Sequence, residues 1–189
     1  EIIYKVILAL GVKVDKLIAD CLYTGITTDT GCFRYASVKA DTYKTAGELV
    51  ECGADNGFIN RMMFENKSKT YVRLEKLALE SMEFFHNERV AVITVTQEMY
   101  RITGSNEQET EALAPITRQI EGVQIGITIR EKTDGTCKAS IRTFEEVSAS
   151  ELAKAFGGGG HPQAAACRFD TDVVAARKLL VEKCGELLK

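Results

Sequence analysis

Apolar residues recur at helical spacing through the first part of the chain. The pattern predicts a helix over residues 1–10, ended by Gly11, and a second helix that starts at Asp15. Further helices are predicted over 41–50, 55–64 and 68–85. The helix over 68–85 has a basic solvent side, and we expect it to connect two domains.

The hydrophobic period changes near residue 89. An apolar run predicts a strand over 90–96, and strict alternation predicts a half-buried strand over 123–129. The capping-box pattern Ser105-x-x-Gln108 predicts a helix to about residue 120. The remaining expected elements are a strand over 137–141 and helices over 148–156 and 172–188. Together these elements predict an α/β domain with a mixed sheet.

The register of the hairpin around Asp134-Gly135 follows from its apolar residues. A two-residue turn would place Ile127 opposite Arg142 and so mix apolar and charged side chains on one face. A three-residue loop with a left-handed Gly135 pairs Ile127 with Ile141 and keeps one face apolar. Arg142 then lies opposite Gly126, and the other face carries Thr128, Arg130, Lys138, Ser140 and Arg142.

Composition narrows the possible functions. The net charge of −3 argues against a protein that binds long nucleic acid by bulk electrostatics, but it permits a local basic site for a short substrate. The six cysteines form no C-x-x-C pair, which predicts reduced thiols in a cytoplasmic protein without a zinc site or a disulfide framework. We expect no signal peptide in this sequence, and none of its apolar runs is long enough to span a membrane.

The run Gly157-Gly158-Gly159-Gly160, followed by His161, is the strongest candidate site. A capping box at Ser148 opens a helix that a left-handed Gly157 would end. Glycines carry no side chain, so their amides can approach an anion closely. A flexible linker is the alternative, but linkers are usually padded with Ser and other polar residues, whereas this run is flanked by Ala-Phe before it and His-Pro-Gln-Ala after it. The guanidinium of Arg142, just upstream, suits bidentate capture of phosphate.

These residues resemble a known family. Residues 157–166 resemble the GGGGHxxAA signature of the DHHA1 substrate-binding domain of DHH phosphoesterases. Residues 140–143 are similar to the Ser-x-Arg-Ser strand of that domain. The resemblance implies that the glycine run, His161 and Arg142 contact a substrate phosphate. From residue chemistry alone, His161 could instead be an inert cap and Arg142 a solvated surface residue.

A second motif, Thr28-Asp29-Thr30-Gly31 followed by Phe33, resembles the last metal-binding motif of the DHH catalytic domain. The resemblance implies that Asp29 is a ligand to one of two divalent ions, usually Mn²⁺. Spacing alone would leave Asp29 an ordinary turn residue. Within the family, the subgroup that the chain resembles is the nano-RNA nuclease and pAp phosphatase type.

The Asp-His-His triplet of the family does not occur in the chain, which starts without methionine inside an apolar segment. We therefore expect a fragment: the C-terminal part of a catalytic domain over 1–66, a connector over 67–87, and a DHHA1 domain over 88–189. The parent protein would hydrolyse short oligoribonucleotides and pAp, whereas the fragment would bind nucleotides with little or no hydrolysis.

Other functions stay open. A cyclic-dinucleotide phosphodiesterase and a single-strand exonuclease belong to the same family, and a non-catalytic nucleic-acid-binding module belongs to a different class. A homodimer is also compatible with the sequence.

Overall fold

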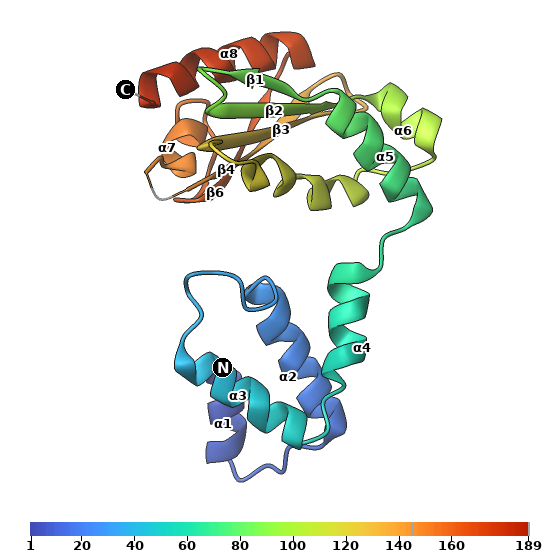
Figure 1. The fold of residues 1–189 in the computed structure, drawn as a ribbon, viewed down its shortest axis with the longest axis vertical. Helices are drawn as coiled ribbons and strands as arrows, with labels where there is room; N and C mark the ends of the chain where they lie inside the picture. The colour runs from blue at the N-terminus through green and yellow to red at the C-terminus, as the bar shows by residue number, and fades with distance from the viewer. Residues whose placement is uncertain (145, 189) are drawn as a thin grey trace. The chain divides into compact units, whose positions relative to one another are not determined.

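The computed structural model describes residues 1–144 and 146–188. They form two compact units, Glu1–Lys67 and Ser68–Lys189, which Figure 1 draws in blue to green and in green to red. The units divide next to the boundary expected near residue 66.

The first unit is helical, as predicted. It contains α1 (Ile2–Ala9), α2 (Lys16–Asp29), α3 (Ala40–Glu51), α4 (Asn56–Asn60) and η1, a π-helical turn (Arg61–Glu65). Asp15 caps α2 by accepting a hydrogen bond from the Ile18 amide, and Gly11, with φ of +69°, follows α1. The core joins these helices through buried residues that include Tyr4, Tyr23 and Leu49.

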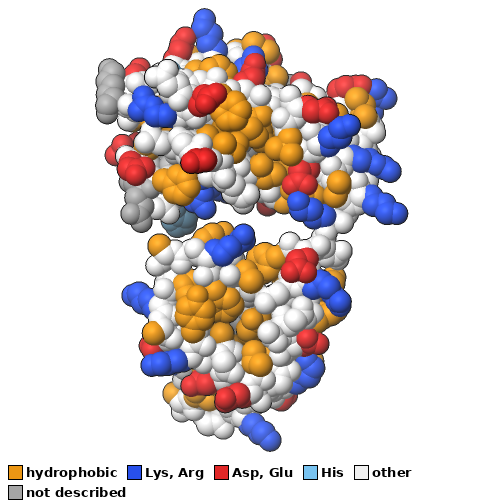
Figure 2. Space-filling view, viewed as in Figure 1, with side chains coloured by type: hydrophobic (Ala, Val, Ile, Leu, Met, Phe, Trp, Pro, Cys, Tyr) orange, Lys and Arg blue, Asp and Glu red, His pale blue; other side chains and the backbone are white. Residues whose placement is uncertain are grey.

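This unit also exposes many large hydrophobic side chains. Ile2, Leu10 and Leu17 are each more than 70% exposed (78%, 73% and 74%). Figure 2 shows such side chains, in orange, grouped on the surface of both units.

The second unit is built on a six-stranded sheet in the order β1-β2-β3-β4-β6-β5. The strands are β1 (Glu83–Phe85), β2 (Val90–Val95), β3 (Ile125–Glu131), β4 (Cys137–Thr143), β5 (Gly159–His161) and β6 (Ala164–Phe169). β2 and β3 are parallel, and the other neighbouring pairs are antiparallel. The predicted α/β fold with a mixed sheet is therefore confirmed.

Helices cover both faces of the sheet (Figure 1). On one face, α7 (Ala149–Lys154) and α8 (Val173–Leu187) pack on the apolar residues of β2, β3, β4 and β6. On the other face, α5 (Lys69–Glu80), α6 (Gln97–Thr103) and the 3₁₀ helix η2 (Glu109–Leu113) pack on Ile93 and Val95 of β2. A second 3₁₀ helix, η3 (Ile116–Gln119), lies beside β3. We call the face covered by α7 and α8 the α8 face, and the face covered by α5, α6 and η2 the α5 face.

The predicted hairpin register is confirmed. Ile127 pairs with Ile141, Ile129 with Ala139, and Gly126 with Arg142, while Gly135 has φ of +80°. Because side chains alternate along a strand, the isoleucines enter the core under α8, and Arg142 belongs to the α5 face.

Two predicted helices are wrong in extent or type. The helix over 68–85 ends at Glu80, and Glu83–Phe85 forms β1 instead. Its residue Leu74 is fully buried in the same cluster as Ile93, so α5 is part of the second unit's core rather than a free-standing connector. The helix expected from Ser105 to residue 120 is replaced by the two short 3₁₀ helices η2 and η3, and α6 ends before Ser105.

The reason for the second error is local capping. Gly104, at φ of +68°, ends α6, and the Ser105 hydroxyl bonds to Thr103 instead of capping a new helix. Asn106 accepts from the amides of Gln108 and Glu109 and takes that capping role.

Candidate substrate-binding site

The glycine run has two structural roles before any ligand is considered. The amide of Gly157 donates to the carbonyl of Lys154 (3.1 Å), and the amide of Gly158 donates to that of Ala153 (2.9 Å). With Gly157 at φ of +69°, these bonds form a Schellman cap that ends α7. Both amides therefore have partners within the protein, whereas the sequence predicts an anion as their partner.

The other two glycines open a strand. Gly159 and Gly160 belong to β5 and pair with Ala166 and Ala165 of β6. Because β5 is at the edge of the sheet, alternate amides on its outer side face away from β6. Gly159, Gly160 and His161 are exposed, so this part of the run can be approached by a ligand.

Close contact explains why two positions need glycine. A β-carbon on Gly158 would lie against the Ala166 carbonyl oxygen and 2.6 Å from the Cys167 β-carbon. A β-carbon on Gly160, where φ is +147°, would lie 2.5 Å from the Ala164 carbonyl oxygen. Both distances are too short for real atoms, so glycine lets β5 approach β6.

The turn after β5 is fixed to the elements around it. The Pro162 carbonyl accepts from the amide of Ala149, the first residue of α7 (2.6 Å), and from the Thr143 hydroxyl (3.3 Å). The Thr143 amide donates to the Gln163 carbonyl (3.2 Å). The segment from Gly157 to Gln163 therefore contacts both ends of α7 and the end of β4.

Register brings the two predicted ligand-binding side chains together. Arg142 on β4 pairs with Ala164 on β6, and Ala164 pairs with His161 on β5. Directly paired residues project from the same face, so Arg142 and His161 share the α5 face with only a methyl group between them. Two strand spacings separate their α-carbons by ~10 Å.

In this row, Arg142–Ala164–His161, the guanidinium of Arg142 and the imidazole of His161 can donate hydrogen bonds to an anion. The imidazole of His161 is exposed and forms no hydrogen bond within residues 1–144 and 146–188. The Arg142 guanidinium is half-buried and donates through Nη1 to the Ile141 carbonyl (3.0 Å). Gly126, the neighbour of Arg142 on β3, could not carry a side chain because Thr117 and the Arg118 amide lie against it.

Part of the predicted polar face is buried. Thr128, Arg130 and Ser140 lie on the α5 face as expected, but only 1%, 6% and 9% of their surfaces are exposed. This burial does not follow from the sequence pattern, which predicts one helix where η2 and η3 lie. Lys138 stays half-buried and Arg142 partly accessible, so the open part of the face lies over β4, β6 and β5.

Comparison with known proteins identifies the family of the second unit. Residues 87–188, more than half of the chain, match the DHHA1 domain. The chain belongs to the DHH/DHHA1 family. The boundary of the DHHA1 match falls next to β2, one residue before the start at 88 that the sequence analysis expected.

Curated relatives of this DHHA1 protein are hydrolytic enzymes. It is 32% identical over 181 residues to the bifunctional oligoribonuclease and PAP phosphatase NrnA of Thermus thermophilus, covering 95% of the chain and 53% of that protein. It is 26% identical over 170 residues to the cyclic-di-AMP phosphodiesterase PdeA of Listeria monocytogenes, covering 89% and 25%. The chain thus spans about half or less of the length of these relatives.

A solved structure shares the fold of both units. An exopolyphosphatase-related protein from Bacteroides fragilis superposes with a TM-score of 0.84 at 29% identity, over 93% of this chain and 53% of that one. The DHHA1 fold is thereby supported by sequence and by structure.

Asp29, the predicted metal ligand, is the last residue of α2 and is exposed. A carboxylate at a helix C-terminus faces the negative end of the helix dipole, and the same end attracts cations. Its chemistry therefore suits a hard divalent ion. In the described part of the chain, however, no three His, Cys, Asp or Glu side chains are grouped to hold a metal, so Asp29 does not build a site by itself.

The motif around Asp29 is held by its neighbours. The Thr30 hydroxyl donates to the Ile26 carbonyl (2.7 Å) and accepts from the Phe33 amide (3.1 Å). Gly31, Cys32 and Phe33 then take left-handed conformations, with φ between +56° and +61°. This turn fixes the direction of the chain directly after Asp29.

The cysteines take no part in the DHHA1 site. All six are free thiols, and Cys167 is 3% exposed on the α8 face, opposite to Ala164 and Ala166. Burial raises the pKa of the Cys167 thiol to about 11. Strand alternation turns this thiol into the core, away from the face that carries Arg142 and His161. None of the described helices combines the length and the apolar character that crossing a membrane requires.

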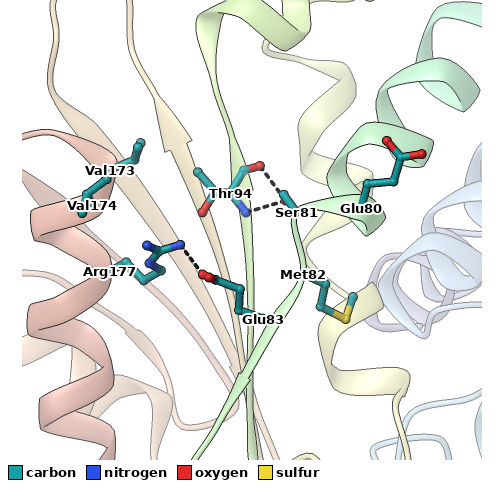
Figure 3. Close-up of a pocket in the computed structure, with 8 residues that line it drawn as sticks. All are labelled: Glu80, Ser81, Met82, Glu83, Thr94, Val173, Val174 and Arg177. Carbon is teal, nitrogen blue, oxygen red and sulfur yellow. Dashed lines mark hydrogen bonds and ion pairs between the residues drawn. The ribbon is translucent and has the colours of Figure 1, made fainter.

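A pocket of about 360 Å³ lies at the β1 edge of the sheet, away from β5 (Figure 3). Its polar groups are bound to one another: Arg177 pairs with Glu83, and the Ser81 hydroxyl bonds to the backbone of Thr94 (2.9 and 3.1 Å). The cation that lines the pocket, Arg177, is therefore already neutralised by Glu83, so the pocket is not suited to bind an anion.

Proposed function

We propose that this chain holds the phosphate groups of a short oligoribonucleotide or of pAp on the row Arg142–Ala164–His161. The whole protein would then hydrolyse that substrate. The observation that carries the proposal is the pairing of Arg142 and His161 with the same alanine, which puts a guanidinium and an imidazole on one accessible face. The substrate class is taken from the name of the Thermus thermophilus relative, an oligoribonuclease and PAP phosphatase.

Each group of the row would have a distinct role. The guanidinium presents a planar fork that matches two phosphate oxygens, and the imidazole donates one hydrogen bond beside it. Outward amides of the edge strand from Gly159 to His161 would add neutral donors. Gly157 and Gly158 would act indirectly, by fixing the position of β5.

Hydrolysis would need metal ligands besides Asp29. Divalent ions, Mn²⁺ in this proposal, would activate water and stabilise charge on the phosphate. Because the described residues offer Asp29 alone, we expect this chain to bind the substrate with little or no turnover and to be part of a longer protein. Free thiols throughout the chain favour a cytoplasmic location.

Binding of pAp tests the proposal. The ligand is titrated into the wild type, Arg142→Ala, His161→Ala and the control Lys178→Ala, with EDTA present so that the ligand stays intact. Lys178 is exposed on α8, so its replacement removes one positive charge from the opposite side of the sheet. We expect about a tenfold weaker affinity for each site variant, typical of a lost charge-assisted hydrogen bond, and no change for the control. Equal affinity in all four proteins would refute the assignment.

A cyclic dinucleotide is the second candidate substrate, because the Listeria relative is named for cyclic di-AMP. The same titration with cyclic di-AMP decides between them. Tighter binding of the cyclic ligand than of pAp and short RNA, lost in His161→Ala, would favour the second candidate.

A further inference from the structure

A second row of cations crosses the α5 face of the DHHA1 sheet. Arg130 on β3 pairs with Lys138 on β4, and Lys138 pairs with Arg168 on β6. Register places the three side chains on the same face as Arg142 and His161. Lys138 precedes Arg142 by four residues on β4, so the two rows are ~13 Å apart along the strand.

This cation row is unfavourable for the protein alone. Like charges that face each other across neighbouring strands destabilise a sheet. In the described part of the chain, the side chains of Lys138 and Arg168 form no ion pair or hydrogen bond. Arg168 interacts electrostatically with Asp134, whose pKa is held below its usual range by hydrogen bonds from Thr136 and, to a smaller extent, by the charge of Arg168.

Arg130 adds a buried donor without a partner. The residue is 6% exposed, and its Nε has no hydrogen-bond partner within the residues that the structure describes. Nη1 reaches the Glu107 carbonyl at a long distance of 3.4 Å, while the Glu107 carboxylate pairs with Lys132 instead. A buried charged donor without an acceptor is costly, and an anion bound beside Lys138 would satisfy it.

The residues between the two rows have short side chains or none. Ser140 pairs with Thr128 on one side and with Ala166 on the other, and Ala166 pairs with Gly159. Thr128 and Ser140 are buried, whereas Ala166 and Gly159 are accessible and small. An extended ligand could therefore lie over β6 and β5 between the two rows without displacing a large side chain.

We propose that Arg130, Lys138 and Arg168 form a second phosphate site, which binds a more distant phosphate of the same single-stranded oligoribonucleotide. This inference rests on the proposed function of the row Arg142–Ala164–His161. The ~13 Å between the rows exceeds the distance between neighbouring phosphates of one strand, so at least one nucleotide lies between the two bound phosphates. An oligonucleotide then occupies both rows, whereas pAp occupies the first row only.

The test compares two ligands in the same set of proteins. Affinities for pAp and for a labelled RNA pentanucleotide are measured with EDTA, at several salt concentrations, for the wild type, Lys138→Ala, Arg168→Ala and the control Lys178→Ala. Lys138 and Arg168 are used because they are accessible, whereas replacing the buried Arg130 would disturb the fold.

We expect Lys138→Ala and Arg168→Ala each to weaken RNA binding about fivefold and to leave pAp binding unchanged. Each lost phosphate contact should also lower the salt dependence of RNA binding by about 0.7 in the log–log slope. The control should match the wild type with both ligands.

Two results would overturn the inference while leaving the first site intact. RNA affinity that is unchanged in both variants would mean that these cations only protect the open edge of β6. An equal loss for pAp and RNA would mean that they act as general surface charge. Failure of the proposed function is distinguishable, because His161→Ala would then bind pAp as well as the wild type.

Discussion

Replacement of Gly158 by alanine tests the close approach of β5 to β6. The new β-carbon would lie against the Ala166 carbonyl oxygen, 2.6 Å from the Cys167 β-carbon and 2.7 Å from its α-carbon. All three neighbours are fixed to the backbone of β6, so none can rotate away. Gly159→Ala is the matched control, because a β-carbon there meets nothing within 4 Å and its φ lies outside the left-handed region.

The expected cost of Gly158→Ala comes from overpacking. Inserting a carbon into a well-packed site forces backbone shifts and costs about 1–3 kcal/mol. Gly159→Ala should change the free energy of unfolding by less than about 0.5 kcal/mol, as surface substitutions usually do. The shift of β5 should also move His161 relative to Arg142, so pAp binding should weaken in Gly158→Ala.

Urea unfolding of both variants measures these costs. Circular dichroism follows the whole chain, and the reaction of the buried Cys184 thiol reports opening of the second unit. If Gly158→Ala proves as stable as Gly159→Ala, the close contact of β5 with β6 is not present in the protein, and the reasoning that fixes His161 in its row fails with it.

Three further predictions concern other parts of the chain. Burial raises the pKa of Cys184 to about 12, so a thiol reagent at pH 8 should label the exposed Cys21 rapidly and Cys184 only on unfolding; fast labelling of both would contradict the core. The hydrogen bond from Lys16 lowers the pKa of the Asp20 carboxyl in the folded protein. The ionised carboxylate therefore stabilises the fold fully above its ordinary pKa of 3.8, and this stabilisation is lost as the pH falls through the pKa of the folded state. Stability measured from pH 6 to pH 2 should therefore fall less steeply in Asp20→Asn, and parallel curves would refute this. A β-carbon at Gly126 would collide with η3, so Gly126→Ala should lower the melting temperature by several degrees in calorimetry, and an unchanged value would show that η3 does not lie there.

Local sequence patterns were sufficient to predict the features that depend on helix capping and on strand alternation. The hairpin register followed from keeping Ile127 and Ile141 on one face, and the end of α7 followed from a glycine that takes a left-handed conformation. Both features depend on residues close together in the sequence, so no tertiary information was needed.

The strands β5 and β6 could not be predicted in the same way. Alanine and glycine have little preference for strands, and the pairing of β6 with β4 joins segments far apart in sequence. Because β6 is not predicted, the sequence does not place Arg168 in the candidate site, although Arg168 follows Ala164 and Ala166 at a period of two. Had residues 164–169 been interpreted as a strand, this alternation would have placed Arg168 beside Lys138.

The hydrogen bonds around α7 have a mechanical consequence for the candidate site. The segment that carries His161 supplies the cap at the C-terminus of α7 through Gly157 and Gly158, and it supplies an acceptor for the first amide of the same helix through Pro162. A ligand that pulled this segment outward would loosen both ends of α7 together. His161 should therefore behave as a rigid, preorganised contact whose position differs little between free and bound protein, rather than as part of a closing flap.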